Sequence, residues 1–327
     1  MRFHIVGLCL GMLFSCAKPP KFENLIDTPL TTGGVNKWQA TWALFFEDDP
    51  RAFPEQELPI RALKMSDMQQ DFAAVWLGHS SILLKLKNNF VLFDPVFGKR
   101  VSPFQWLGPI RAHPLPIDVK ELPKLSAVVI SHDHHDHLDE NTIWELNART
   151  EKFFVPLEVG AILRDWGVPH DKIVELNWWQ SVEHGGLKIS CTPARHFSGR
   201  GLVNWNQTLW ASWVVEHPQL KVFFGGDTGF FETFSEIGNK FGPFDLTLMP
   251  IGAYDELWSA IHVTPEESVR AHKMLNGKLF FPIHWATFDL SRHAWDEPKK
   301  RFLDAATDID YVLPLPGEVV QLNPTTR

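Results

Sequence analysis

The chain has 327 residues, of which 44% are apolar and 21% charged, and its formal net charge is −8. These proportions are ordinary for a folded globular protein. The negative charge and the lack of a long basic run argue against a nucleic-acid partner, which is usually bound by a face rich in Lys and Arg. The three cysteines, Cys9, Cys16 and Cys191, cannot build a cysteine-based zinc motif. Any metal must therefore be held by nitrogen and oxygen ligands.

The N-terminus has the pattern of an export signal. Arg2 supplies a positive charge, and residues 5–14 form an apolar stretch that is too short to cross a bilayer as a stable helix. The sequence Leu-Phe-Ser-Cys at residues 13–16 resembles the end of a bacterial lipoprotein signal, in which cleavage leaves Cys16 as the lipidated first residue. An ordinary signal peptide cleaved nearby and an uncleaved membrane anchor are the alternatives.

These features predict the organisation of the chain. We expect residues 1–15 to be a lipoprotein-type signal peptide and residues 16–36, which contain Pro, Thr and Gly, to be a tether. Residues 37–327 then form a single folded domain. Several acyl chains on Cys16 would anchor the protein firmly to a membrane. Ala17, in place of an acidic residue, favours the outer membrane, so the expected location is the bacterial cell envelope, facing the periplasm.

The predicted elements begin with a helical face. Trp38, Trp42, Phe45 and Phe46 have helical spacing and are expected to pack on the core, with an apolar lip for a lipid substrate as the alternative. Short apolar runs bounded by turn residues predict strands at residues 74–77, 81–86, 90–93, 127–130, 187–192, 211–216, 221–224, 246–251 and 278–282. Helices are predicted at residues 140–148, 157–166 and 265–275, the last with Thr264 as its N-cap before Pro265.

This order of elements predicts one domain with two facing sheets and helices outside them. Two stretches also share one plan. Residues 81–94 read as strand, turn, strand and aspartate, and residues 211–227 repeat that order. The repetition hints at a duplicated half.

The strongest chemical signal is Ser-His-Asp-His-His-Asp-His-Leu-Asp at residues 131–139, directly after a predicted strand. Neutral imidazole is a good metal ligand at neutral pH. On a loop between strand and helix, His132 and His134 can turn to one metal while Asp136 and His137 turn to a second. A nonspecific His-rich metal trap and a solvated loop are the alternative interpretations.

Downstream residues favour the metal site. His196, Asp227 and His284 each follow a predicted strand. Strand ends that converge on one edge are where sheet proteins tend to place sites. The pair Gly225-Gly226 before Asp227 would let the backbone turn tightly toward a metal.

Taken together and in this order, these residues resemble the metallo-β-lactamase superfamily. The resemblance implies an α/β (α+β) fold, the αβ/βα sandwich of two facing mixed sheets with helices on the outer faces, and makes residues 37–327 a hydrolase domain. It also implies a ligand set: one metal bound by His132, His134 and His196, a second bound by Asp136, His137 and His284, and Asp227 bridging both. Two zinc ions are the default, and manganese or iron would accept the same ligands.

The expected chemistry is hydrolysis. Two cations about 3.5–4 Å apart can share a water and lower its pKa toward about 7, and the resulting metal-bridging hydroxide is the expected nucleophile. Asp136, which would also orient that hydroxide, and Asp227 are therefore the candidate catalytic residues. Cys191 is expected to be a buried strand residue without a catalytic role.

Further blocks resemble the N-acylphosphatidylethanolamine-hydrolysing phospholipase D family and its bacterial lipoprotein relatives. They are WLGHSS at 76–81, SPFQWLGP at 102–109, FFGGDTGF at 223–230, PIGAYDELW at 250–258, HVTPEESVRAH at 262–272 and IHWATF at 283–288. The resemblance implies a phospholipid substrate, split at the phosphodiester on the head-group side into phosphatidic acid and N-acylethanolamine.

The same blocks supply three candidate substrate-binding residues, His262, His79 and Tyr254. The region through residue 70 departs from the family pattern, which leaves another phosphodiester lipid open as the substrate. A lactonase of the ascorbate-phosphate type, with a similar Gly-His-Ser block, is the alternative enzyme. A non-catalytic metal-binding envelope lipoprotein is the alternative of another class.

Overall fold

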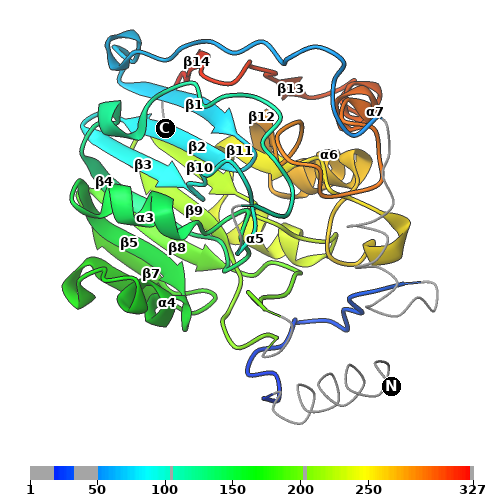
Figure 1. The fold of residues 1–327 in the computed structure, drawn as a ribbon, viewed down its shortest axis with the longest axis horizontal. Coiled ribbons are helices and arrows are strands. Elements are labelled where there is room, and N and C mark those ends of the chain that lie inside the picture. Colours follow the sequence, from blue (N-terminus) through cyan, green and yellow to red (C-terminus); the bar gives the residue numbers. More distant parts are fainter. Residues whose placement is uncertain (1–17, 33–50, 104–105, 202–204, 325–327) are drawn as a thin grey trace.

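The structure, a computed structural model, describes residues 18–32, 51–103, 106–201 and 205–324 (Figure 1). The predicted signal peptide, Cys16 and the helical face at residues 38–46 lie outside the described residues. None of the described helices combines the length and apolar content that crossing a bilayer requires.

The first of two sheets comes from the first half of the chain and its last strand. Its strand order is β14 (Val319–Gln321), β1 (Phe72–Gly78), β2 (Ser81–Leu86), β3 (Asn89–Phe93), β4 (Leu125–Val129), β5 (Thr150–Pro156) and β6 (Ile173–Leu176). Neighbours are antiparallel from β14 to β3 and parallel from β3 to β6. The sheet is therefore mixed, as predicted.

The second sheet repeats this plan. Its strand order is β13 (Asp310–Tyr311), β12 (Gly277–Ile283), β11 (Phe244–Pro250), β10 (Leu220–Phe224), β9 (Ser212–His217), β8 (Leu187–Thr192) and β7 (Ser181–His184). Neighbours are parallel from β13 to β10 and antiparallel from β10 to β7. Both sheets thus change direction at the second strand of a hairpin, β3 or β10, and each of these strands is followed by the aspartate of the predicted repeat.

Helices cover the outer face of each sheet (Figure 1). Those over the first sheet are α3 (Glu140–Asn147) and α4 (Val159–Asp165), and those over the second are α5 (Thr233–Phe241), α6 (Pro265–Met274) and α7 (Glu297–Ala305). Four 3₁₀ turns complete the described elements: η1 (Met65–Asp67), η2 (Val119–Glu121), η3 (His170–Lys172) and η4 (Glu256–Trp258). The layers form the expected αβ/βα sandwich.

The central core lies between the two sheets and is rich in aromatic side chains. Phe93 of β3 and Phe224 of β10 are fully buried and stack across it with ring centroids 4.6 Å apart. Trp213 of β9 is also buried there and donates its indole N–H to the carbonyl of Ile130, 2.9 Å away. Cys191 packs in the same core, as the sequence predicted.

Most predicted elements are found within two residues of their expected ends, and α6 has the predicted Thr264 cap, with a reciprocal bond to Glu267. The helix predicted at residues 157–166 is shorter. The carbonyl of Leu157 accepts a hydrogen bond from the backbone of Leu209, and Glu158 has a φ of 70°, so the helix begins only at Val159. The sequence did not predict β5, β6, β7, α5, α7, β13 or β14.

Residues 18–32, which fall in the segment expected to be a tether, lie along the domain. The backbone N–H groups of Lys21 and Phe22 donate to the carbonyl of Asn206 at 2.9 and 3.1 Å. The backbone N–H of Thr32 donates to the carbonyl of Leu257 at 2.8 Å.

The stacked pair at the centre of the core generates a stability prediction. Phe224→Ala should lower the free energy of unfolding by about 3–5 kcal/mol, because it removes buried apolar contacts and leaves a cavity between the sheets. Urea unfolding in the presence of a chelator, which removes any contribution of metal binding, measures this loss. The matched control is Phe53→Ala, at a side chain that is 39% exposed, which should cost less than about 1 kcal/mol. Equal losses in the two variants would contradict the packing described here.

Candidate metal centre

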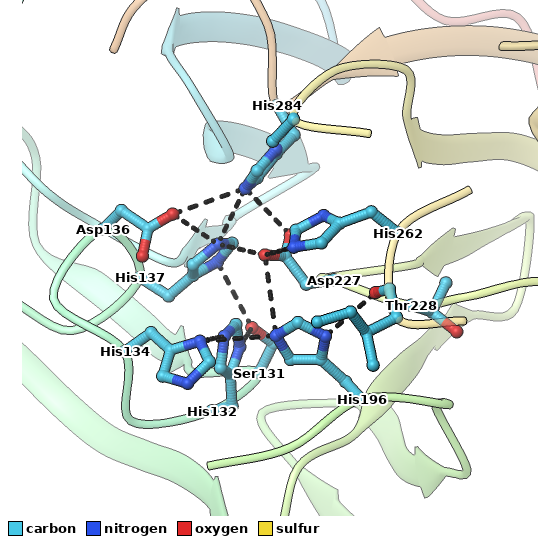
Figure 2. Close-up of polar contacts among 12 residues, drawn as sticks. Ser131, His132, His134, Asp136, His137, His196, Asp227, Thr228, His262 and His284 are labelled. Carbon is cyan, nitrogen blue, oxygen red and sulfur yellow. Dashed lines mark hydrogen bonds and ion pairs between the residues drawn. The ribbon is translucent and has the colours of Figure 1, made fainter. Parts of the chain in front are cut away.

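All seven predicted metal ligands converge at one edge of the sandwich, where several strands end (Figure 2). The loop after β4 supplies four of them, and the segments after β8, β10 and β12 supply one each. They are His132, His134, Asp136 and His137 from the first loop, then His196, Asp227 and His284. His132 and His284 thus lie in one buried cluster, although they are 152 positions apart in the sequence.

The first group consists of three histidines. Nε2 of His132 lies 2.8 Å from Nδ1 of His134, which lies 3.3 Å from Nε2 of His196. Nδ1 of His196 lies 3.0 Å from the carbonyl of Ile261, which can only accept, so Nδ1 carries the proton and Nε2 keeps its lone pair for the cluster. Burial lowers the pKa of both His132 and His196 well below 6.5, so both are neutral and able to bind a metal.

The second group adds a carboxylate. Nε2 of His284 lies 3.2 Å from Nε2 of His137, and Oδ2 of Asp136 lies 3.3 and 3.4 Å from the same two nitrogens. Asp227 stands between the groups. Its Oδ1 is 3.0 Å from Nε2 of His284, and its Oδ2 is 3.1 Å from Nε2 of His137 and 3.9 Å from Nε2 of His196.

The negative charge of the two carboxylates in this cluster favours bound cations. Burial opposes ionisation of Asp227, but His137 and His284 outweigh it and hold the pKa of that carboxyl well below its usual range. Burial likewise lowers the pKa of His284, but Asp227 and Asp136 outweigh burial and raise this pKa to about 9. The pKa of His137 is raised well above 6.5 against the effect of burial, chiefly by Asp227 and Asp136. Two buried carboxylates thus need positive charge beside them, and inward-facing imidazole and carboxylate donors fit two divalent cations.

Asp94 holds one ligand in place and was not assigned a role from the sequence. Its buried carboxylate accepts from Nδ1 of His137 at 2.6 Å and from the backbone N–H and hydroxyl of Ser131 at 2.7 and 2.5 Å. This bond fixes the His137 tautomer so that Nε2 faces the cluster. Because Asp94 follows β3 as Asp227 follows β10, the repeat noted in the sequence is the signal that could have identified it.

Arg200 stabilises the loop that carries four of the ligands. Its Nη1 donates to the backbone carbonyls of Asp133 and Leu138, both at 2.7 Å, and its guanidinium lies over the ring of Trp166 at 5.0 Å. The backbone N–H of Gly199 also donates to the Asp133 carboxylate at 2.7 Å. No pattern in the sequence pointed to these contacts, and the three hydrogen bonds join residues more than 60 positions apart.

The backbone is bent sharply at the ligands. Gly226 has a φ of +57°, and a Cβ there would lie 2.6 Å from Cβ of Ser131, so the turn into Asp227 requires glycine as predicted. His79 and His284 adopt left-handed φ values of 53° and 63°, and the backbone N–H of His284 donates to the carbonyl of His79 at 2.9 Å. Such strained conformations in non-glycine residues cluster at functional sites.

The three candidate substrate-binding residues lie in different places. Nε2 of His79 lies 2.9 Å from Oδ2 of Asp136, and Nε2 of His262 lies 4.0 Å from Oδ2 of Asp227. Burial lowers the pKa of His79 to about 3 and that of His262 to about 4, so both are neutral donors at pH 7. Tyr254 is not brought to the cluster, because its hydroxyl donates to Glu297 of α7 at 2.8 Å. Its contact with substrate stays a prediction.

A pocket of about 220 Å³ opens above the ligands. Its floor is polar, formed by His134, Asp136, Asp227, His262 and His284. Its walls are mostly apolar and come from Leu30, Thr31, Phe197, Trp205, Ala253, Trp258, Ile261 and Leu290. The sequence did not identify these walls, because they come from segments that meet only in the folded chain.

Comparison with known proteins agrees with this geometry. The family described as "Beta-lactamase superfamily domain" matches residues 89–285, which include all seven ligands. The chain therefore belongs to the metallo-β-lactamase superfamily of metal-dependent hydrolases. Igni18, a metallo hydrolase from Ignicoccus hospitalis, has a similar fold, with a TM-score of 0.58 at 23% identity over 78% of this chain and 99% of that one.

Two relatives are more similar in sequence. An uncharacterized protein of Mycobacterium tuberculosis is 50% identical over 254 residues, which is 76% of this chain and 68% of the relative. N-acyl-phosphatidylethanolamine-hydrolyzing phospholipase D 1 of Caenorhabditis elegans is 36% identical over 274 residues, which is 78% of this chain and 77% of the worm protein.

The contact between Asp94 and His137 predicts a specific loss of metal affinity. Asp94→Asn keeps the size of the side chain but removes the charge that holds the His137 tautomer, so zinc affinity should fall about 10- to 100-fold. Competition with a fluorescent chelator measures this change. Asp304→Asn, at an exposed position of α7, is the matched control and should bind zinc like the parent. Equal affinity in both variants would show that Asp94 has no part in the centre.

The raised pKa values predict proton release on metal binding. At pH 7 the metal-free protein carries protons on His137 and His284, which the metals must displace, so zinc uptake should release about two protons. Because protons compete with zinc at these nitrogens, apparent affinity should rise with pH up to about 9, the pKa of His284. Calorimetry in buffers with different heats of ionisation counts the protons. Uptake without proton release would contradict the charge balance described here.

Proposed function

We propose that this protein is a phosphodiesterase of the phospholipase D type, acting on N-acylphosphatidylethanolamine or a related lipid. The observation that carries the proposal is the two-part pocket, whose polar floor of candidate metal ligands and His262 lies beneath mostly apolar walls. A phosphodiester lipid matches this pocket, because it joins a charged phosphate to apolar chains. The similarity to the worm phospholipase D supports the same substrate class.

In the proposed reaction, water is the second substrate. The bond between phosphorus and the oxygen of the N-acylethanolamine group breaks, the hydroxyl of water joins phosphorus, and a proton goes to the leaving oxygen. The products are phosphatidic acid and N-acylethanolamine. Two divalent cations at this site would make water more acidic and neutralise the charge that builds on the phosphoryl oxygens.

The side chains of this chain have distinct parts in that reaction. The three histidines of the first group would hold one cation, and Asp136, His137 and His284 would hold the other, with Asp227 shared. His79 donates to Asp136 and keeps that carboxylate oriented. His262 is neutral and lies on the pocket floor, so we propose that its Nε2–H donates to a phosphate oxygen.

We further propose that the protein is anchored to the bacterial envelope through acylated Cys16. The backbone contacts the domain from Lys21 onward, five residues after Cys16. The five residues from Cys16 to Lys21 reach at most about 17 Å when fully extended. An anchor at Cys16 would therefore hold the domain close to the membrane that contains its lipid substrate.

The direct test is hydrolysis of N-acylphosphatidylethanolamine in mixed micelles by the full-length, zinc-loaded chain. In ¹⁸O-labelled water, mass spectrometry should find the heavy oxygen in phosphatidic acid and none in N-acylethanolamine, because water attacks phosphorus. Asp227→Asn should reduce the rate at least about 100-fold, since it removes the shared charge between the metal groups. Asp304→Asn is the matched control and should keep the parent rate.

Other products would overturn the proposal in recognisable ways. Release of diacylglycerol would place the cleavage on the other side of the phosphate. Hydrolysis of a soluble lactone without hydrolysis of the lipid would favour the lactonase alternative. Binding of two metals with no hydrolysis of either substrate would favour the non-catalytic alternative.

A further inference from the structure

Residues 18–32, called the N-terminal strap from here on, lie beside the metal centre and outside the residues matched by the family. One part of the strap is held at the carbonyl of Asn206, and its end at Thr32 is held at the carbonyl of Leu257. The first contact lies on the segment that follows His196, and the second lies on the segment that leads to His262. The strap therefore joins the two segments that form this side of the site.

The side chain of Asn24, in the strap, forms hydrogen bonds with the backbone of the candidate metal ligand His196. Its Nδ2 donates to the carbonyl of His196 at 2.7 Å, and its Oδ1 accepts from the backbone N–H of His196 at 3.1 Å. The same Oδ1 accepts from the indole N–H of the buried Trp210 at 3.1 Å. Both backbone polar groups of His196 thus have one side chain as their partner, and that side chain is itself fixed.

The strap also holds the residue before His196. Arg195 donates from Nε to the hydroxyl of Thr28 at 3.1 Å and from Nη2 to the carbonyl of Asp27 at 3.1 Å. On its other side, the His196 ring donates from Nδ1 to the carbonyl of Ile261. The position of His196 is therefore set by the strap through the backbone and by the Ile261 segment through the ring.

Leu30 of the strap forms part of the pocket. Like Phe197, it packs against the buried pair Trp258 and Ile261. Together with Thr31 it lines the pocket above the metal ligands. Leu25, five residues earlier, is instead 52% exposed. The strap thus directs one leucine into the pocket wall and leaves the other at the surface.

We propose that the N-terminal strap contributes two functional residues to the active site. Asn24 is a positioning residue that holds His196 in place for its metal, and Leu30 is a specificity-determining residue that contacts the apolar part of the substrate. The role of Asn24 depends only on the metal centre. The role of Leu30 rests on the proposed function, in that it requires a phosphodiester substrate with an apolar group.

Zinc binding tests the role of Asn24 without any assay of activity. In the full-length chain, Asn24→Ala should weaken the binding of zinc about tenfold, as loss of an outer partner of a metal ligand does. It should also reduce the rise in unfolding temperature that zinc produces. Glu23→Ala, at the neighbouring exposed position, is the matched control and should leave both quantities at the parent values. Parent-like zinc binding by Asn24→Ala would overturn the positioning role.

Chromogenic substrates test the role of Leu30. For the parent chain, kcat/KM should be higher for p-nitrophenyl hexyl phosphate than for p-nitrophenyl methyl phosphate. Leu30→Ala should lower the ratio of these two values about fivefold, because it removes apolar surface from the pocket wall. Leu25→Ala makes the same change at an exposed position and should leave the ratio unaltered. An equal ratio in the parent and the Leu30 variant would overturn this role.

These probes separate the strap from the lipid assignment. If the chain does not hydrolyse N-acylphosphatidylethanolamine but Leu30→Ala still lowers the hexyl-to-methyl ratio, the proposed lipid is wrong and the strap proposal stands. If the lipid is hydrolysed and the Leu30 and Leu25 variants behave alike, the proposed function stands and the wall role of Leu30 falls.

Discussion

The structure depends on keeping two carboxylates and five imidazoles together in one largely buried cluster. Asp227 lies at the centre of this group, within 3.1 Å of nitrogens from both His137 and His284. Burying charge in this way is costly unless each charge is paired and hydrogen-bonded. The residues around the cluster keep these charged groups in position. Asp94 holds His137, Arg200 braces the ligand loop, and the backbone at His79 and His284 is bent into strained conformations.

The parts of this centre that could be predicted from the sequence are those carried by short, local patterns. The ligands of residues 132–137 stand next to one another, and His196, Asp227 and His284 each follow an apolar strand. Alternation and turn residues likewise placed the hairpins β2–β3 and β9–β10. The repeat of these hairpins also indicates Asp94, which occupies the position in the first half that Asp227 has in the second.

The parts that could not be predicted arise from contacts between distant segments. Asn24 meets His196 across 172 positions, and no local pattern records that pairing. Leu30, Trp205 and Leu290 form one pocket only because three separate segments converge there. Tyr254 lies in a block that resembles a lipid-hydrolysing family, yet its hydroxyl is taken by Glu297. Strand β5 begins with three polar or charged residues, Thr-Glu-Lys, which hid it from an apolar pattern.

The central claim is that these side chains hold two metals that share Asp227. Crystals of the zinc-loaded, full-length chain, measured on both sides of the zinc absorption edge, test it most directly. We expect two anomalous peaks about 3.5–4 Å apart. One should contact His132, His134 and His196, the other should contact Asp136, His137 and His284, and Asp227 should contact both. A single peak, or two peaks that do not share Asp227, would contradict it.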